Sequence, residues 1–173
     1  MSRRTLLLLL LLLLVARGVL VLSIADVFFY GEELAKGTAA KALGDGLGVP
    51  AWKLVYVHHE GGGFLVTCLK TLLFDVLGPC VLAHKLLALA TTAILLAVGY
   101  WMTCEHFGRV AGALFGLLFV LCPEAFMRFS LLSLGTHFEG LIGIALVLHY
   151  GARILFRETP ARSDWAFLGV FSR

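Results

Sequence analysis

The side chains that could do chemistry are concentrated in one segment of the chain, residues 25–81. Glu32 and Glu33 stand side by side near its start, and His59 and Glu60 come directly before three glycines. A carboxylate can act as general base toward an incoming hydroxyl or amine, and imidazoles with carboxylates can hold a divalent metal. Almost everything around this segment is apolar. Ionisable groups are costly to keep near lipid, so in a membrane protein they are functional candidates.

Each of these groups also has a plainer interpretation. An acidic pair at the start of a helix is favoured by the helix dipole, which would explain Glu32 and Glu33 without catalysis. His59 and Glu60 could belong to a hydrated loop whose glycines make a tight turn. Adjacent residues seldom all bind one ion, so a metal site here would use Glu60 with one histidine at most.

Further candidates lie outside this segment. His137 and Glu139 form a second polar spot between two apolar stretches. Arg17 interrupts an apolar run and could either snorkel to the membrane interface or meet a lipid phosphate. Arg128 follows Glu124 by four residues, so it could neutralise that carboxylate or stabilise the phosphate of a donor.

The composition is that of an integral membrane protein. Of the 173 residues, 60% are hydrophobic and 14% are charged, and the mean hydropathy is +0.96. Soluble domains contain about 25% charged residues. The net charge of +3 is small, and the basic residues cluster in short loops, which indicates topology rather than nucleic-acid binding. The four cysteines lie in apolar runs without CxxC spacing, so we expect small buried side chains rather than a disulfide or zinc framework.

Hydropathy predicts one membrane domain over residues 1–173, with four spans at 5–24, 82–104, 110–132 and 139–156. The leucine-rich first span has the positive start of a signal peptide, but no small-x-small cleavage site follows it. We therefore expect an uncleaved span with a cytoplasmic N-terminus. Residues 165–173 are too short to cross and are either an interfacial anchor or the start of a fifth span. We favour the second interpretation, in which the chain is the N-terminal portion of a longer protein.

The external loop 25–81 is predicted to carry two helices, at 31–43 and 61–77. The second has apolar residues on one side and Thr67, Lys70, Thr71 and Asp75 on the other, which is typical of a helix lying in the membrane interface. If it does not cross, Lys and Arg are missing from the external turn 133–138 and gather on the opposite side. His137 and Glu139 then share one face of the membrane with the acidic residues of the loop.

This layout resembles the GT-C superfamily of polytopic glycosyltransferases, which includes protein O-mannosyltransferases and aminoarabinose transferases. The family's external loop opens with an acidic pair, here Glu32-Glu33, and has a motif of the E-K-P-P kind between two interfacial helices, here His59-Glu60-Gly61-Gly62. Its "lfG" before a basic residue and a span is similar to 76–85, and its "fgr" is similar to 107–109. A Glu replaces the usual Asp of the pair, and Gly-Gly replaces Pro-Pro.

The resemblance implies an all-α polytopic helix bundle in a bacterial inner membrane. It implies transfer of a sugar from a polyprenyl-phosphate donor on the external face. We expect Glu32 to be the base, with Glu33 second. The expected substrate-binding residues are Glu60, His59, His137, Glu139, Arg128 and Arg17. A divalent metal on Glu60 and His59 is the one cofactor expected.

Two other classes of protein remain open from the sequence. One is a small non-enzymatic membrane protein, such as a metal-binding transporter subunit that uses the His/Glu cluster. Transporters place their ionisable groups near the middle of the membrane, whereas these groups gather at one face, which favours chemistry at the surface. The other is a helix bundle with a purely structural role.

Overall fold

The computed structural model describes residues 2–24, 31–47, 63–135, 137–156, 165–166 and 169. These residues form six helices: α1 (Arg3–Ile24), α2 (Gly31–Gly44), α3 (Phe64–Leu77), α4 (Val81–Val120), α5 (Glu124–Phe129) and α6 (Phe138–Phe156). The expected all-helical fold is confirmed for this part of the chain. His59, Glu60 and six of the nine residues of the expected fifth span, 165–173, lie outside it.

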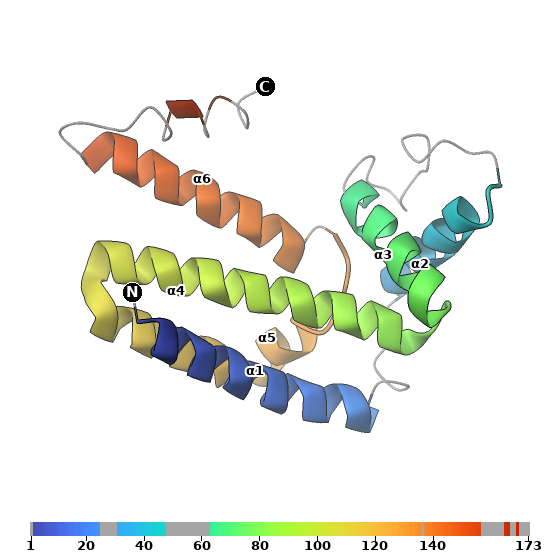
Figure 1. Cartoon of the computed structure of the whole chain (residues 1–173), viewed down its shortest axis with the longest axis horizontal. Coiled ribbons are helices and arrows are strands. Elements are labelled where there is room, and N and C mark those ends of the chain that lie inside the picture. The colour runs from blue at the N-terminus through green and yellow to red at the C-terminus, as the bar shows by residue number, and fades with distance from the viewer. Residues whose placement is uncertain are drawn as a thin grey trace.

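Three of the helices, α1, α4 and α6, are long and apolar enough to cross a membrane. Figure 1 shows α1 and α6 on either side of α4, with α2 and α3 gathered at the end where α4 begins. Much of the apolar surface of α1 faces outward; Leu8, for example, is 67% exposed. That pattern suits helices whose outer faces meet lipid rather than water.

Helix α4 is a hairpin of two helical arms rather than one straight rod. Its backbone leaves helical geometry at Gly108, where φ is +89°, and the chain turns back there (Figure 1). Only glycine adopts this conformation without strain. The arms pack closely, since a Cβ on Gly112 would lie 2.3 Å from the Cys104 sulfur. The reversal falls within the boundary expected at residues 105–109.

The expected span 110–132 is not one continuous helix. The second arm of α4 ends at Val120, α5 begins at Glu124, and residues 130–135 are irregular. Pro123 explains the break, because it lacks an N–H and disfavours helical geometry in the residue before it. From Gly108 to Val120 a helix rises only about 18 Å, short of the roughly 30 Å hydrocarbon core.

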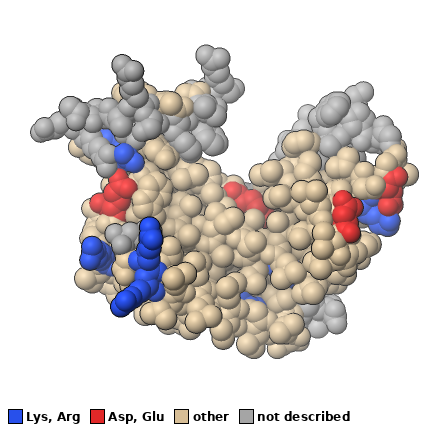
Figure 2. Space-filling model, viewed as in Figure 1, with Lys and Arg blue, Asp and Glu red and all other residues tan. Residues whose placement is uncertain are grey.

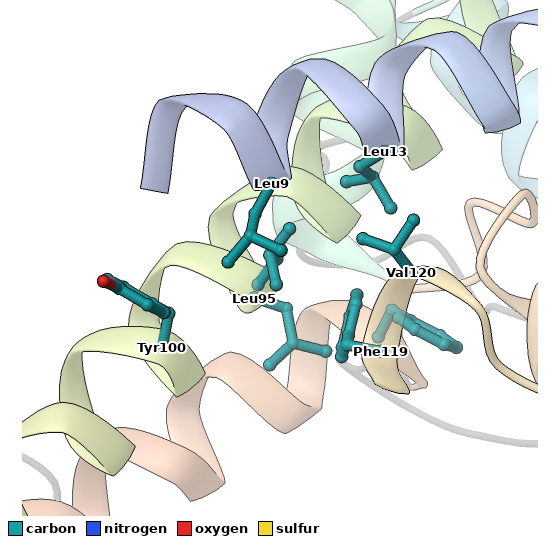
Figure 3. Close-up of a cluster of buried hydrophobic side chains, with 8 residues drawn as sticks. Leu9, Leu13, Leu95, Tyr100, Phe119 and Val120 are labelled. Atoms are coloured by element: carbon teal, nitrogen blue, oxygen red, sulfur yellow. The ribbon is translucent and has the colours of Figure 1, made fainter. Parts of the chain in front are cut away.

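The apolar core lies between α1 and the two arms of α4. Leu9 and Leu13 from α1 meet Leu95 from the first arm and Val120 from the second (Figure 3). Aromatic rings extend this core, since Phe126 of α5 is 4.9 Å from Phe138 of α6 between ring centroids. This packing ties the short helix α5 to the bundle.

The packing defines two ends of the molecule. At the first, named the site end, α2 and α3 meet the start of α4 and residues 130–139. At the second, named the reversal end, the start of α1, the turn at Gly108 and the last turns of α6 come together. The Tyr100 hydroxyl donates to the Ser2 carbonyl there, and His106 contacts His149 of α6 at 3.1 Å.

Candidate site at the junction of α2, α3 and the 130–139 segment

Helix α3 buries polar residues and exposes apolar ones, which is the reverse of a helix on the surface of a water-soluble protein. Its polar residues Thr67 and Lys70 are fully buried, whereas Leu72 and Val76 are 63% and 80% exposed. The Thr71 hydroxyl donates to the Ala40 carbonyl of α2 at 3.1 Å. Of the four residues on the expected polar side, Thr67 and Lys70 are packed into the protein, Thr71 is half-buried and Asp75 is exposed.

Glu33 is at the centre of a buried polar network. Its carboxylate accepts a hydrogen bond from the Lys85 ammonium at 2.7 Å and from the Ser133 backbone N–H at 3.0 Å. Glu33 and Lys85 are almost completely removed from solvent. The first acidic pair is thus split: Glu33 points into the protein, and Glu32 remains partly exposed.

A second lysine completes this network. The Lys70 ammonium donates to the Ser133 carbonyl at 2.9 Å and to the Glu33 carbonyl at 3.4 Å. Burial lowers the pKa of Lys70 to about 8, and the nearby Glu33 charge opposes that shift. The two carbonyl oxygens accept hydrogen bonds from the protonated form of Lys70, which is the form that the Glu33 charge favours.

These buried groups hold the irregular segment 130–134 inside the bundle. Lys85 donates to the Leu131 carbonyl at 3.2 Å, and Thr92 donates to the Ser130 carbonyl at 2.7 Å. Non-helical backbone at membrane depth persists only where protein or water satisfies its polar groups. The charged side chains provide that satisfaction here, so the main role of Glu33 and Lys85 in the structure is to position this segment.

The remaining polar groups lie beside the network without being paired. Both carboxylate oxygens of Glu139 are buried, with no hydrogen-bond partner among the described residues. Lys36 is 4% exposed and has no hydrogen bond or ion pair within the described part of the chain. Burial lowers the pKa of Lys36, and the charges of Glu32 and Glu139 oppose that shift. Glu32, Lys36 and Glu139 thus form a polar group of mixed charge, in which both carboxylates act on the Lys36 ammonium.

The surface of the molecule is hollowed at the site end. Figure 2 shows the surface indented between α6 and the α2–α3 pair, with an acidic side chain at the floor of the indentation. A separate apolar cavity of about 380 Å³ lies between α5 and the start of α6 and is lined by Phe129, His137 and Phe138, among others. Glu139 and the apolar cavity therefore both lie at the first turn of α6.

The other candidate residues have separate roles. Arg17 is fully buried and donates to the Ser130 hydroxyl at 3.1 Å and to the Cys122 sulfur at 2.9 Å, so it does not snorkel to the interface. Arg128 is exposed and pairs with Glu124, which agrees with the interpretation that it neutralises that carboxylate. His137 is exposed and stacks on Phe129, with ring centroids 5.9 Å apart.

The structure thus brings Glu32, Glu33 and Glu139 to one end, as the topology argument expected. Sequence reasoning missed Lys36, Lys70 and Lys85 as members of the site. The available signal was Lys85, a cation near the start of an apolar span, because such residues nearly always have a partner. No group of three His, Cys, Asp or Glu side chains converges as a metal site within the described residues. The expected pair His59 and Glu60 lies outside them.

Comparison with known proteins gives no family assignment: no family model, no curated protein and no solved structure matches the chain.

Proposed function

We propose that this chain forms part of a membrane glycosyltransferase of the GT-C type, in which α2 and α3 are interfacial helices of the first external loop. The proposed reaction transfers a sugar from a polyprenyl-phosphate donor at the external face of a bacterial inner membrane. The supporting observation is the group of mixed charge formed by Glu32, Lys36 and Glu139, in which Lys36 is buried and lies within the electrostatic influence of both carboxylates. In such a group, a carboxylate can remove a proton from the sugar acceptor, and the ammonium can bind the phosphate of the donor.

Glu32 is the proposed base. It is the member of the acidic pair that keeps contact with solvent, whereas Glu33 is committed to Lys85 and Ser133. A base must reach the proton that it removes, which a fully buried and paired carboxylate cannot do. In this assignment Glu33 is a positioning residue, because it fixes the segment that leads to Glu139.

Lys36 is the proposed partner of the donor phosphate. It has no ion pair among the described residues, and burial lowers its pKa, whereas the charges of Glu32 and Glu139 favour its protonated form. Lys36 is one helical turn after Glu32, so the base and the phosphate-binding cation lie on the same side of α2. Glu139 faces Lys36 from α6 and holds it in place electrostatically.

The test uses a photoreactive polyprenyl phosphate bound to the purified chain in phosphatidylcholine vesicles. We expect cross-links within α2, α3 and residues 130–139, competed by unlabelled polyprenyl phosphate and not by phosphatidic acid. Lys36→Met is expected to reduce labelling about tenfold, as loss of one charge-assisted phosphate contact implies. Lys41→Met is the matched control, because Lys41 lies on the same helix, is exposed and pairs with Asp45. Labelling spread evenly over α1 and α4, or equal in both variants, would contradict the proposal.

A further inference from the structure

The reversal end carries a set of arginines that the proposed function does not use. Arg3 and Arg4 begin α1, and Arg109 directly follows the turn of α4 at Gly108. All three are exposed. None has a side-chain hydrogen bond or ion pair within the described residues, in contrast to Arg17, Arg128 and Arg153.

Packing brings these three residues to the same level of the bundle. Leu9 meets Gly116, and Arg17 contacts Cys122, so α1 and the second arm of α4 run in the same direction. Arg3 precedes Leu9 by six residues, and Arg109 precedes Gly116 by seven. The rise of both helices is the same, so the start of α1 and the start of the second arm are level with each other. Figure 2 shows blue side chains gathered at this end.

The nearest acidic residue does not neutralise them. Glu105 lies three residues before the turn, and its carboxylate contacts His149 at 3.7 Å and Arg153 at 3.8 Å. Both partners are on α6, so Glu105 is directed toward that helix. Among the described residues, no ion pair gives a counter-charge to these three arginines, which lie where the apolar surfaces of α1 and α4 end.

We propose that Arg3, Arg4 and Arg109 form a binding surface for the headgroup phosphates of anionic phospholipids in the leaflet at the reversal end. A guanidinium binds a phosphate through two parallel hydrogen bonds, and it keeps its charge at the edge of a membrane. The exposed leucines of α1 lie directly beyond the arginines and would contact the acyl chains of the same lipid. The surface does not depend on the glycosyltransferase assignment, because it lies at the opposite end from that site.

Trp101 provides a reporter for this surface. It lies in the first arm of α4, seven residues before Gly108, and is half-buried against the His149 ring at 4.2 Å. Replacing Trp52 and Trp165 with Phe would leave Trp101 as the one tryptophan. The purified protein would be placed in phosphatidylcholine vesicles that contain a small fraction of dibrominated phosphatidylglycerol or dibrominated phosphatidylcholine, whose bromines quench nearby tryptophan.

We expect dibrominated phosphatidylglycerol to quench Trp101 at a lower fraction than dibrominated phosphatidylcholine. One basic residue near an anionic surface is worth about fivefold in binding, so Arg109→Gln should reduce the preference about fivefold. The triple variant R3Q/R4Q/R109Q should abolish it. The variant R3K/R4K/R109K, which keeps the charge, should retain most of it, and 0.5 M salt should weaken it through screening.

Arg128→Gln is the matched control, because Arg128 is exposed but lies on α5 and pairs with Glu124. Equal quenching by the two lipids in the unmodified protein would overturn the proposal. A preference that survives in R3Q/R4Q/R109Q, or that disappears equally in Arg128→Gln, would overturn it as well. The lysine variant and the salt dependence keep the test decisive if the triple glutamine variant does not fold.

Discussion

Replacing Glu33 with Gln separates a structural role for this residue from a catalytic one. In the structure its two carboxylate oxygens serve different partners, the Lys85 ammonium and the Ser133 N–H. Glutamine keeps the shape of the side chain and one acceptor oxygen but removes the negative charge. Lys85, which is 2% exposed, would then be a buried cation without its carboxylate.

The expected loss of stability is large. Removing one member of a buried ion pair costs about 3–5 kcal/mol, because the remaining charge stays desolvated and unpaired. A chain of this size loses about 2–4 °C of Tm for each kcal/mol, so Glu33→Gln should lower Tm by roughly 6–20 °C. The exposed pair of Lys41 and Asp45 contributes at most about 1 kcal/mol by comparison. Asp45→Asn is therefore the matched control.

The assay is thermal unfolding of the purified protein in detergent, followed with a dye that fluoresces on reaction with newly exposed cysteines. All four cysteines are free and half-buried in the folded protein. The double variant E33M/K85M removes both charges and should be more stable than Glu33→Gln. It should stay about 1–3 kcal/mol below the unmodified protein, because the Ser133 N–H loses its acceptor.

Two results would refute this reasoning. A change of Tm below about 2 °C for Glu33→Gln would mean that the pair contributes little. A double variant E33M/K85M that is less stable than Glu33→Gln would mean that the charges do not compensate each other. In either case, Glu33 would return as a candidate base beside Glu32.

Three other predictions concern pH, packing and topology. Burial lowers the pKa of Lys70 from 10.5 to about 8, so between pH 8 and pH 10.5 the unfolded chain binds more protons than the folded chain. The stability of the folded protein should therefore rise as the pH increases from 8 to 10.5. Lys70→Met should flatten that rise, measured by thermal unfolding. Gly112→Ala should destabilise the protein by about 1–3 kcal/mol, because the added Cβ would overlap the Cys104 sulfur. Gly143→Ala should have little effect in the same assay, because the space around Gly143 is open. In a cysteine-free background, a membrane-impermeant thiol reagent applied to whole cells should label Asp45→Cys and not Phe107→Cys; the opposite labelling would invert the proposed orientation.

Much of the fold could be predicted because hydropathy and helix-breaking residues are local signals. The spans at 5–24 and 139–156, the turn near 105–109 and the helices at 31–43 and 61–77 all correspond to helices or turns in the structure. The error lay in 110–132, where apolar composition continues past the end of the helix. Hydropathy counts side chains, and it does not register that Pro123 interrupts the backbone hydrogen bonds.

The candidate site could be predicted only in outline. The positive-inside argument brought Glu139 to the same end as Glu32, and the structure agrees. The sequence could not show which of Glu32 and Glu33 is buried, because that depends on which of the two side chains pairs with a buried cation. The partner of Glu33, Lys85, is 52 residues away, and no local pattern connects the two.

The network around Glu33 also has a consequence for synthesis. Glu33 is synthesised early in translation, but the N–H from which its carboxylate accepts a hydrogen bond belongs to a residue made 100 positions later. Until α4 and the 130–134 segment have been inserted, the nascent chain carries a carboxylate and two ammonium groups that have not all met their partners. Chains that stall or are cut before Ser133 should therefore carry a Glu33 carboxylate that lacks one of its two partners. The full set of contacts around Glu33 can therefore form only after the chain has been synthesised as far as Ser133.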